Sequence, residues 1–463
     1  TAYNEYDGEA GVVLDSIWKR IAFAFRYRDL NLLISGEIRP DSRVLVERNV
    51  GHILEDVAPF LELDTDPYPV IVDGKILWVL DLYTTTSWYP YSQPLTPGAS
   101  GPIGRLAQSS ELTAGINYMR NSVKAVVDAY DGHVTFYLVD PEDPLARAWS
   151  QAYPDLFRPS SEIPEALVPH LRYPQDLFRV QGQLYLEYHI TDPNELFSRN
   201  DAWSLPADPA TINRVSGVPG AELLQGDSRD LTTGQTGYRA EILPYYLLTK
   251  LPGEEDLSYL LLQPFTPRDR RNMSSFLVAD STPGRYGRLI DFRMPQGDFV
   301  DGTQQVGQRI DQDAEISEQF TLWDNQGSRV IKGDLLVVPI KDSLLYIQPI
   351  FLAASEGGIP EFRRVIVVYG DQVEWAETLD LALEQVFGEG TGGDDEEPPP
   401  SPDGETVAEL LAEASAAFER ADAALTAGDL AEYQRWVDEA KRLIDEAQAI
   451  ADGGVEARLG ATG

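Results

Sequence analysis

The most apolar stretch of the chain runs from Thr321 to Leu352, where β-branched and aromatic residues are interrupted by turn signals at even intervals. Short strands are predicted between turns at Asn325-Gln326-Gly327, Lys332-Gly333 and Lys341-Asp342-Ser343. Leu335–Ile340 and Leu344–Leu352 are apolar throughout, which predicts strands in the middle of a sheet. Pro339 and Pro349 argue against that position, because proline is typical of strand ends, edges and bulges. We expect this block to form the centre of the main sheet.

Two segments, Pro69–Tyr83 and Asn121–Val139, each place an Asp-Gly pair between runs of strand-forming residues. Asp-Gly favours a two-residue turn, since both central residues of that turn need a positive φ. Asp73-Gly74 and Asp131-Gly132 are therefore predicted to close two β-hairpins.

Apolar residues recur at helical spacing in Gly11–Ser35, where the stripe consists of Val13, Ile17, Ile21 and Phe25. Ser42–Leu61 is a second predicted helix. Gln175–Ile190 is a third, and it follows Pro174 as helix starts often do. Hairpins and helices thus alternate without a regular βαβ rhythm. This order predicts an α+β fold of mixed, mostly antiparallel sheets built from hairpins with flanking helices.

Composition divides the chain into four predicted parts. Residues 1–215 are an N-terminal α+β part, and residues 216–388 are a β-rich central part. Residues 389–404, EGTGGDDEEPPPSPDG, are a disordered acidic linker, because Gly, Pro and like charges cannot bury apolar area. Residues 405–453 hold two amphipathic helices joined at Gly428-Asp429, which predicts a C-terminal αα-hairpin.

The formal net charge is −38. It argues against nucleic acid as a partner, because binding a polyanion needs a positive surface. The absence of cysteine excludes thiol catalysis, disulfides and cysteine-ligated metals. No run of 18 apolar residues occurs, so no membrane-spanning helix is predicted within this sequence. The sequence starts TAYNEY without a Met, and we expect it to be part of a longer protein.

A basic island in this acidic chain lies in the first predicted helix, where Lys19, Arg20, Arg26 and Arg28 are interleaved with Trp18. One interpretation is a core helix with a solvated basic face, which the residues alone favour. The other is a helix lying on a membrane surface, where aromatic residues and cations both bind well.

Two further groups are candidate binding residues: Trp88, Tyr89 and Tyr91 in an aromatic loop, and Arg268, Arg270 and Arg271 after Pro267. The arginine group could hold a phosphate or a carboxylate. The alternative, which the acidic composition favours, is that these arginines form internal ion pairs with nearby Asp and Glu.

Two runs of acids at alternate positions are candidate metal ligands: Asp311, Asp313 and Glu315, and Glu62, Asp64 and Asp66. Oxygen ligands of this kind suit calcium. The first run lacks the turn glycine and the distal Glu of a calcium loop. The alternative, solvated acids in a chain with 75 Asp and Glu, is favoured. No cofactor is predicted, and calcium at these acids is the one candidate.

Several long segments resemble one family: DPYPVIVDGKILWVLDLYTTTSWYPYS, YMRNSVKAVVDAYDGHVTFYLVD and GQRIDQDAEISEQFTLWDNQGSRVIKGDLLVVPI. They are similar to the large soluble region of bacterial membrane proteins called uncharacterised protein family 0182. The resemblance implies a preceding set of membrane-spanning helices and a place on the outer face of the plasma membrane. It implies no activity, because the family offers no catalytic residues to carry over.

Three functions are compatible with these features. The leading hypothesis is a non-enzymatic extracytoplasmic domain of a multi-span membrane protein, which binds or scaffolds envelope proteins or lipids as a monomer or homo-oligomer. The second is an envelope hydrolase that works with carboxylates such as Asp311 and Asp313. The third is a divalent-cation-binding accessory domain of a transport system. The spanning helices of the same protein are the expected partner in each case.

Overall fold

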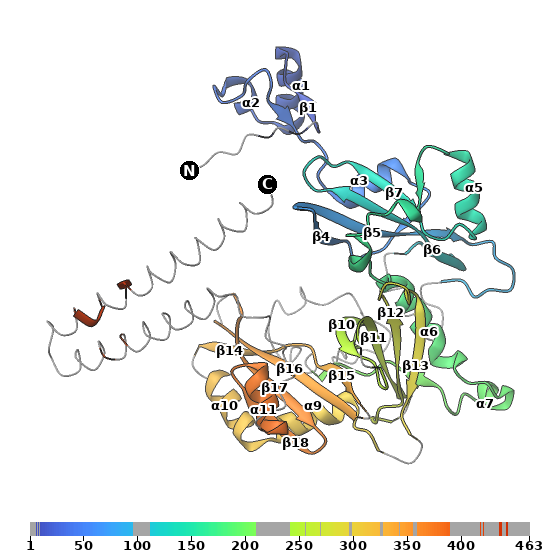
Figure 1. Cartoon of the computed structure of the whole chain (residues 1–463), viewed down its shortest axis with the longest axis vertical. Coiled ribbons are helices and arrows are strands. Elements are labelled where there is room, and N and C mark those ends of the chain that lie inside the picture. Colours follow the sequence, from blue (N-terminus) through green and yellow to red (C-terminus); the bar gives the residue numbers. More distant parts are fainter. Residues whose placement is uncertain are drawn as a thin grey trace. The chain divides into compact units, whose positions relative to one another are not determined.

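The computed structural model describes residues 6, 8, 10–95, 112–209, 241–254, 256–268, 270–295, 299–324, 327–341, 343–354, 359–388, 417, 420, 435–437, 441 and 442. The chain divides into two compact units, Thr1–Ala382 and Leu383–Gly463. Figure 1 shows the helices and strands of the first unit, which form separate, mostly antiparallel sheets with helices packed on them. The predicted α+β fold is confirmed.

The N-terminal sheet has six strands in the order β3-β5-β6-β7-β8, with β4 also paired to β5. The strands are β3 Glu62–Leu63, β4 Tyr68–Val72, β5 Lys75–Thr86, β6 Tyr118–Asp128, β7 Val134–Leu138 and β8 Phe157–Pro159. The helices around it are α3 Val50–Val57, α5 Pro144–Ala152, η1 Ser160–Glu162 and η2 Val168–His170. One face packs on Leu54 of α3, and the other packs on Leu167 and Leu171 beside η2. Both faces of this sheet are therefore covered.

The second sheet has the order β10-β11-β12-β13, with β9 paired to the end of β11. Its strands are β9 Trp203–Ser204, β10 Tyr245–Lys250, β11 Leu257–Pro267, β12 Ser275–Asp280 and β13 Arg288–Arg293. Helix α6, Gln175–Tyr188, covers one face through Phe178 and Leu186, and the short helix α7, Pro193–Ser198, follows it. The prediction of a helix at Gln175–Ile190 is confirmed.

The third sheet has the order β14-β16-β17-β18, with β15 also paired to β16. Its strands are β14 Ser328–Lys332, β15 Leu336–Ile340, β16 Ser343–Ala354, β17 Glu361–Tyr369 and β18 Gln372–Ala376. The helices in this part are α9 Thr303–Gln312, α10 Ala314–Asp324 and α11 Leu379–Phe387. One hydrophobic core joins this sheet to the second, with Leu260 and Val278 contributed by the second sheet and Ile350 and Ile366 by the third.

The prediction that Thr321–Leu352 forms the centre of a sheet is confirmed in part. Strand β16 lies mid-sheet, as predicted, between β17 on one side and β14 and β15 on the other. The prediction for Leu335–Ile340 is wrong, because β15 pairs only with β16 among the described strands and is an edge strand. Pro339 is tolerated there because an edge strand leaves one side of its backbone unpaired. Pro349 lies in β16, next to the bulge between Ile350 and Phe351.

Two helix predictions are too long. Gly11–Ser35 contains α1, Ile17–Tyr27, and α2, Asn31–Ile34, because Arg28 takes a left-handed conformation (φ 53°) that ends α1. In Ser42–Leu61, the first residues form β2, Arg43–Val44, which pairs with β1, Val12–Val13. Helix α3 begins only at Val50, because the Asn49 side chain accepts hydrogen bonds from the Gly51 and His52 amides.

The second unit is described at few positions, and all of these except Gly388 are helical. The guanidinium of Arg420 lies 4.9 Å from the ring centroid of Trp436, so residues of the two predicted C-terminal helices contact each other. The linker at 389–404, the boundary at 215/216 and most of 405–453 lie outside the described residues. Within the described part of the chain, no helix is long and apolar enough to span a bilayer.

The two Asp-Gly turns differ. Asp73 and Gly74 both have positive φ (50° and 73°), as a two-residue turn requires. The second turn is wider, because Asp128 and His133 pair across it and Gly132, with φ 69°, takes the left-handed position without Asp131. The hairpin prediction is confirmed, but the prediction of a two-residue turn at Asp131-Gly132 is wrong.

Gly132→Val is expected to lower the free energy of unfolding by about 1–2 kcal/mol, because a side chain is strained at positive φ. A Cβ at Gly132 would have no atom within 4 Å, so the effect would come from the backbone alone. Gly36→Val is the matched control, since Gly36 is equally open but does not have a left-handed φ. Urea denaturation of the two variants measures the difference, and equal midpoints would contradict this account of the turn.

Candidate functional site

A cavity of about 390 Å³ lies where strands β9 and β11 end and helix α9 begins. One wall comes from the loop after β11, which contributes Arg268, Arg270 and Arg271 to the lining. Thr303 and Gln304 at the start of α9 line the opposite part. The sequence-predicted arginine group is therefore brought to one cavity, together with a helix N-terminus about 30 residues further along the chain.

The arginine loop is held tightly against the start of α9. A Cβ at Gly302, the residue before α9, would lie 1.8 Å from the Arg271 carbonyl oxygen, so only glycine allows this approach. The amide of Met273 also donates to the Val300 carbonyl oxygen at 2.9 Å. Thr303 donates its buried hydroxyl to the Ala207 carbonyl oxygen at 2.9 Å. These contacts fix the two walls relative to each other.

The three arginines have different partners. Arg268 forms an ion pair with Glu187 of α6 at 3.4 Å, as the internal ion-pair interpretation expects. Arg271 donates to the side-chain oxygen of Gln308 at 3.5 Å, which is a neutral partner. The Arg270 guanidinium has no ion-pair or hydrogen-bond partner among the described residues. Two of the three positive charges therefore have no carboxylate partner in the described structure.

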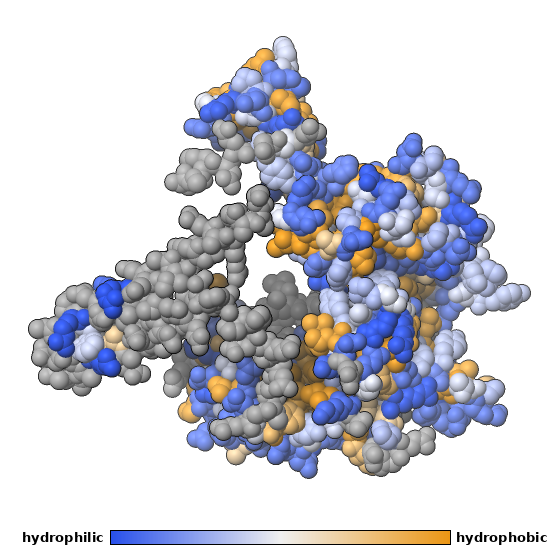
Figure 2. Space-filling model, in the orientation of Figure 1, coloured by the Kyte–Doolittle hydropathy of each residue, from blue (hydrophilic) through white to orange (hydrophobic). Residues whose placement is uncertain are grey.

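Helices α1 and α2 expose most of their apolar residues. Trp18 is 74% exposed and Phe25 is 87% exposed, and Leu30 and Ile34 are exposed as well. Figure 2 shows hydrophobic residues beside hydrophilic ones on this segment. Of the residues in α1, only Ala24 is buried. The stripe predicted to face a core therefore faces solvent.

The cations of this segment have local contacts. Lys19 pairs with Asp15 at 2.9 Å, and Arg20 donates to the Ile38 carbonyl oxygen at 2.9 Å. Arg26 lies over the Tyr27 ring, 6.0 Å from its centroid. Arg28 is exposed where α1 ends.

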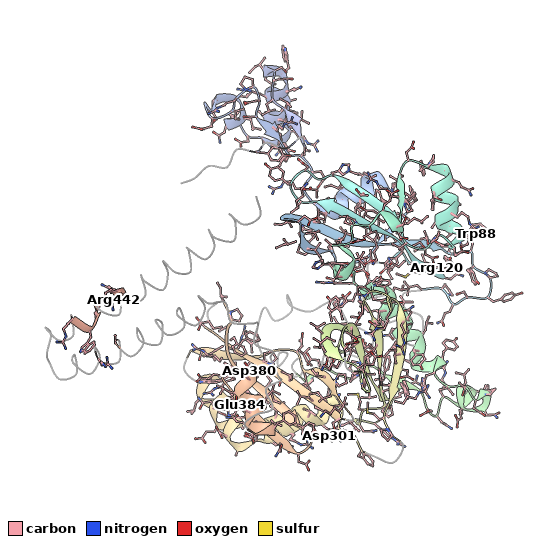
Figure 3. The ribbon with its side chains drawn as sticks, viewed as in Figure 1. Trp88, Arg120, Asp301, Asp380, Glu384 and Arg442 are labelled. Carbon is pink, nitrogen blue, oxygen red and sulfur yellow. The ribbon has the colours of Figure 1, made fainter. Side chains whose placement is uncertain are left out.

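The aromatic loop is also exposed. Figure 3 shows Trp88 on the loop that follows β5, and Arg120 on the neighbouring strand β6. Trp88 is 89% exposed. Tyr89 stacks on Tyr118, with ring centroids 5.5 Å apart, and its backbone exchanges two hydrogen bonds with the Asn117 side chain. Tyr91 is exposed with a positive φ, so the loop presents aromatic rings from a fixed backbone.

The six acids proposed as calcium ligands have separate partners. Asp311 pairs with Lys332, Asp313 accepts from the Ile316 amide, and Glu315 accepts from the Trp375 indole. Glu62 accepts from Thr113, Asp64 is buried, and Asp66 faces Arg172 at 3.7 Å. Across the described ranges, no three acidic, His or Cys side chains are grouped as metal ligands. The calcium sites remain predictions without geometric support.

Sequence reasoning missed a buried ion pair between β5 and β6. Asp81 and Lys124 are directly opposite in the strand register, and their side chains are only 4% and 2% exposed. Lys124 also donates to the Arg172 carbonyl oxygen at 3.1 Å and lies 5.1 Å from the centroid of the Tyr286 ring. The available signal was a charged residue in the middle of each apolar strand, VLDLY and VKAVV.

A second buried group joins Asp64 to Asp176 at the start of α6. The Asp64 carboxylate accepts from the Asp176 amide at 3.0 Å and from the Tyr83 hydroxyl, while Asp176 accepts from the Thr65 amide at 3.0 Å. Burial, followed by the charge of Asp176, raises the pKa of Asp64 to about 6. Both carboxyls are enclosed and hydrogen-bonded, and neither lines the arginine cavity, so their contacts indicate a structural role.

The geometry defines an α+β protein with an arginine-lined cavity and an exposed aromatic and basic segment. Residues 1–323 match the family described as "Uncharacterised protein family (UPF0182)", and the chain belongs to this family. It is 40% identical over 446 residues to a UPF0182 protein of Desulforamulus reducens, covering 93% of this chain and 43% of that protein.

Two other UPF0182 proteins also match most of this chain. A UPF0182 protein of Methanospirillum hungatei is 39% identical over 439 residues, which cover 94% of this chain and 45% of the relative. One from Trichodesmium erythraeum is 39% identical over 394 residues, covering 84% and 40%. The chain thus spans less than half the length of these relatives. No solved structure matches it.

Proposed function

We propose that this chain is the extracytoplasmic binding region of a membrane-bound UPF0182 protein, and that α1 and α2 hold it against the lipid surface. The observation that carries the proposal is the exposure of the apolar residues of α1 and α2 next to four cations. The relatives are more than twice as long as the matched region, which leaves room for spanning helices of the same protein. Those helices and other envelope components are the proposed partners.

The chemistry of this segment suits a membrane interface. Trp18 and Phe25 can move their rings from water into the interface, at about 25 cal/mol for each Å² buried. Between residues 11 and 48 the chain has seven Lys or Arg against five Asp or Glu, although the whole chain has a net charge of −38. Charges further than about 8–10 Å away are screened at physiological salt, so the local positive charge decides attraction to anionic lipid.

The test is cosedimentation of residues 1–463 with phosphatidylglycerol-containing vesicles. We expect binding that Arg26→Gln/Arg28→Gln weakens by roughly tenfold or more, because each cation near an anionic surface contributes about 1 kcal/mol. Trp18→Ser/Phe25→Ser should weaken vesicle binding at low and at high salt, because the contribution of these two apolar side chains is not screened by ions.

Trp88→Ser is the matched control for these variants, because Trp88 is as exposed as Trp18 but lies on another element. It should bind vesicles like the unchanged chain. Equal loss in all three variants, or no vesicle binding by the unchanged chain, would overturn the proposal.

A further inference from the structure

The arginine cavity is unusual for its charge. The residues that line it include three arginines and, among the described residues, one carboxylate, Glu241. The chain as a whole has twice as many acidic as basic residues, with 75 Asp and Glu against 37 Lys and Arg. A concentration of cations in one cavity of an acidic protein costs free energy through mutual repulsion, and a bound anion would remove that repulsion.

Each wall supplies donors of a kind that binds oxyanions. A guanidinium presents five N–H groups in a planar fork that matches two oxygens of a phosphate or carboxylate. The first amides of α9 have no acceptor within the helix, and they belong to Thr303 and Gln304, which line the cavity. The arginines are the main anion-binding groups of the cavity, and the N-terminus of α9 adds to their positive electrostatic potential.

The cavity is larger than an inorganic anion. At about 390 Å³ it falls in the range of small-molecule sites, so an oxyanion would leave room for an organic remainder. The remaining wall includes the hydroxyls of Ser204 and Thr266, which lie 3.3 Å apart and can bond a polar remainder. Leu205 and Pro206 give that wall an apolar part of limited size.

We propose that this cavity binds a phosphate monoester of a small polyol, with the phosphate held by Arg270 and Arg271 and the hydroxyls of the ligand facing Ser204 and Thr266. Arg268, which already pairs with Glu187, adds charge from one side. A phosphate monoester presents three terminal oxygens, enough to contact both Arg270 and Arg271, which have no carboxylate partner among the described residues, whereas a single carboxylate presents only two. The same chemistry occurs in a free metabolite and in a lipid headgroup.

The experiment is isothermal titration of residues 1–463 with sn-glycerol 3-phosphate at low salt. We expect saturable binding with one site, which Arg270→Gln weakens by about tenfold or more, because the phosphate loses a charge-assisted hydrogen-bond donor. Arg271→Gln should have an effect of similar size. Arg363→Gln is the matched control, since Arg363 is an exposed arginine on β17 that pairs with Glu361 at 3.1 Å.

Further ligands test which chemical class the cavity binds and whether the ligand is a free metabolite or a lipid headgroup. Glycerol should not bind, and citrate should compete only weakly. Arginine-dependent binding to vesicles with phosphatidic acid, without binding of glycerol 3-phosphate, would support the same chemistry from a lipid source. Equal competition by citrate would overturn the assignment to phosphate. Absence of binding to all these probes at millimolar concentration, or binding that Arg270→Gln and Arg271→Gln leave unchanged in folded protein, would overturn the site.

This inference is independent of the membrane proposal. Trp18→Ser/Phe25→Ser should leave the titration with glycerol 3-phosphate unchanged, and Arg270→Gln should leave binding to phosphatidylglycerol vesicles unchanged. The two proposals can therefore fail separately.

Discussion

Lys124→Met is expected to lower the free energy of unfolding by about 3–5 kcal/mol, because it leaves the Asp81 carboxylate buried without its counter-charge. The Lys124 ammonium is enclosed by Asp81, the Arg172 carbonyl oxygen and the Tyr286 ring. Urea denaturation followed by tryptophan fluorescence measures this loss.

Two variants test the cause of that loss. Lys75→Met is the matched control, because Lys75 lies on the same sheet and is itself exposed, although it also pairs with an acid, the half-buried Asp128, at 3.7 Å. Its removal should change stability by less than about 1 kcal/mol. Asp81→Leu/Lys124→Met should recover most of the stability, since the pair is then replaced by apolar groups. If Lys124→Met behaves like Lys75→Met, the buried pair does not stabilise the sheet as we describe.

Asp64→Asn is expected to change how stability depends on pH. The folded pKa of Asp64, about 6, lies above its unfolded value of about 3.9. Its proton therefore stabilises the folded state fully below about pH 3.9, and this contribution is lost as pH rises through about 6. Between pH 4 and pH 7, the unfolding free energy of the unchanged chain should fall relative to Asp64→Asn by on the order of 2 kcal/mol.

Asp143→Asn provides a control of opposite sign. Burial raises the pKa of Asp143, but hydrogen bonds from Thr84, Tyr118 and Ser122 outweigh burial and lower it below its usual value. The Asp143 contribution is therefore present above the unfolded pKa and is lost as pH falls. Equal pH profiles for the two variants, measured by urea denaturation at fixed salt, would be incompatible with these contacts.

The sequence was most informative where structure depends on neighbouring residues. Asp73-Gly74 predicts its turn because the conformations of only two residues decide it. Arg268, Arg270 and Arg271 could be recognised as a group because they lie within four positions. Both are local patterns, and both are present in the structure.

Features that depend on distant residues could not be predicted. Strand β15 looks central by composition, but its position at an edge depends on which strands pair with β16. The exposure of Phe25 depends on which surfaces lie beside α1, which its helical spacing does not reveal. The contact between Asp64 and Asp176 joins residues 112 positions apart, so neither residue indicates the other.

The continuity of each sheet along the chain has a consequence for biosynthesis. The three large sheets come from residues 62–159, 203–293 and 328–376, without strand exchange between these stretches. Each sheet can thus form soon after its own residues emerge, because every strand pairs within the same stretch of the chain. We expect the chain to fold progressively from its N-terminus during synthesis, with the core shared by the last two sheets assembling at the end.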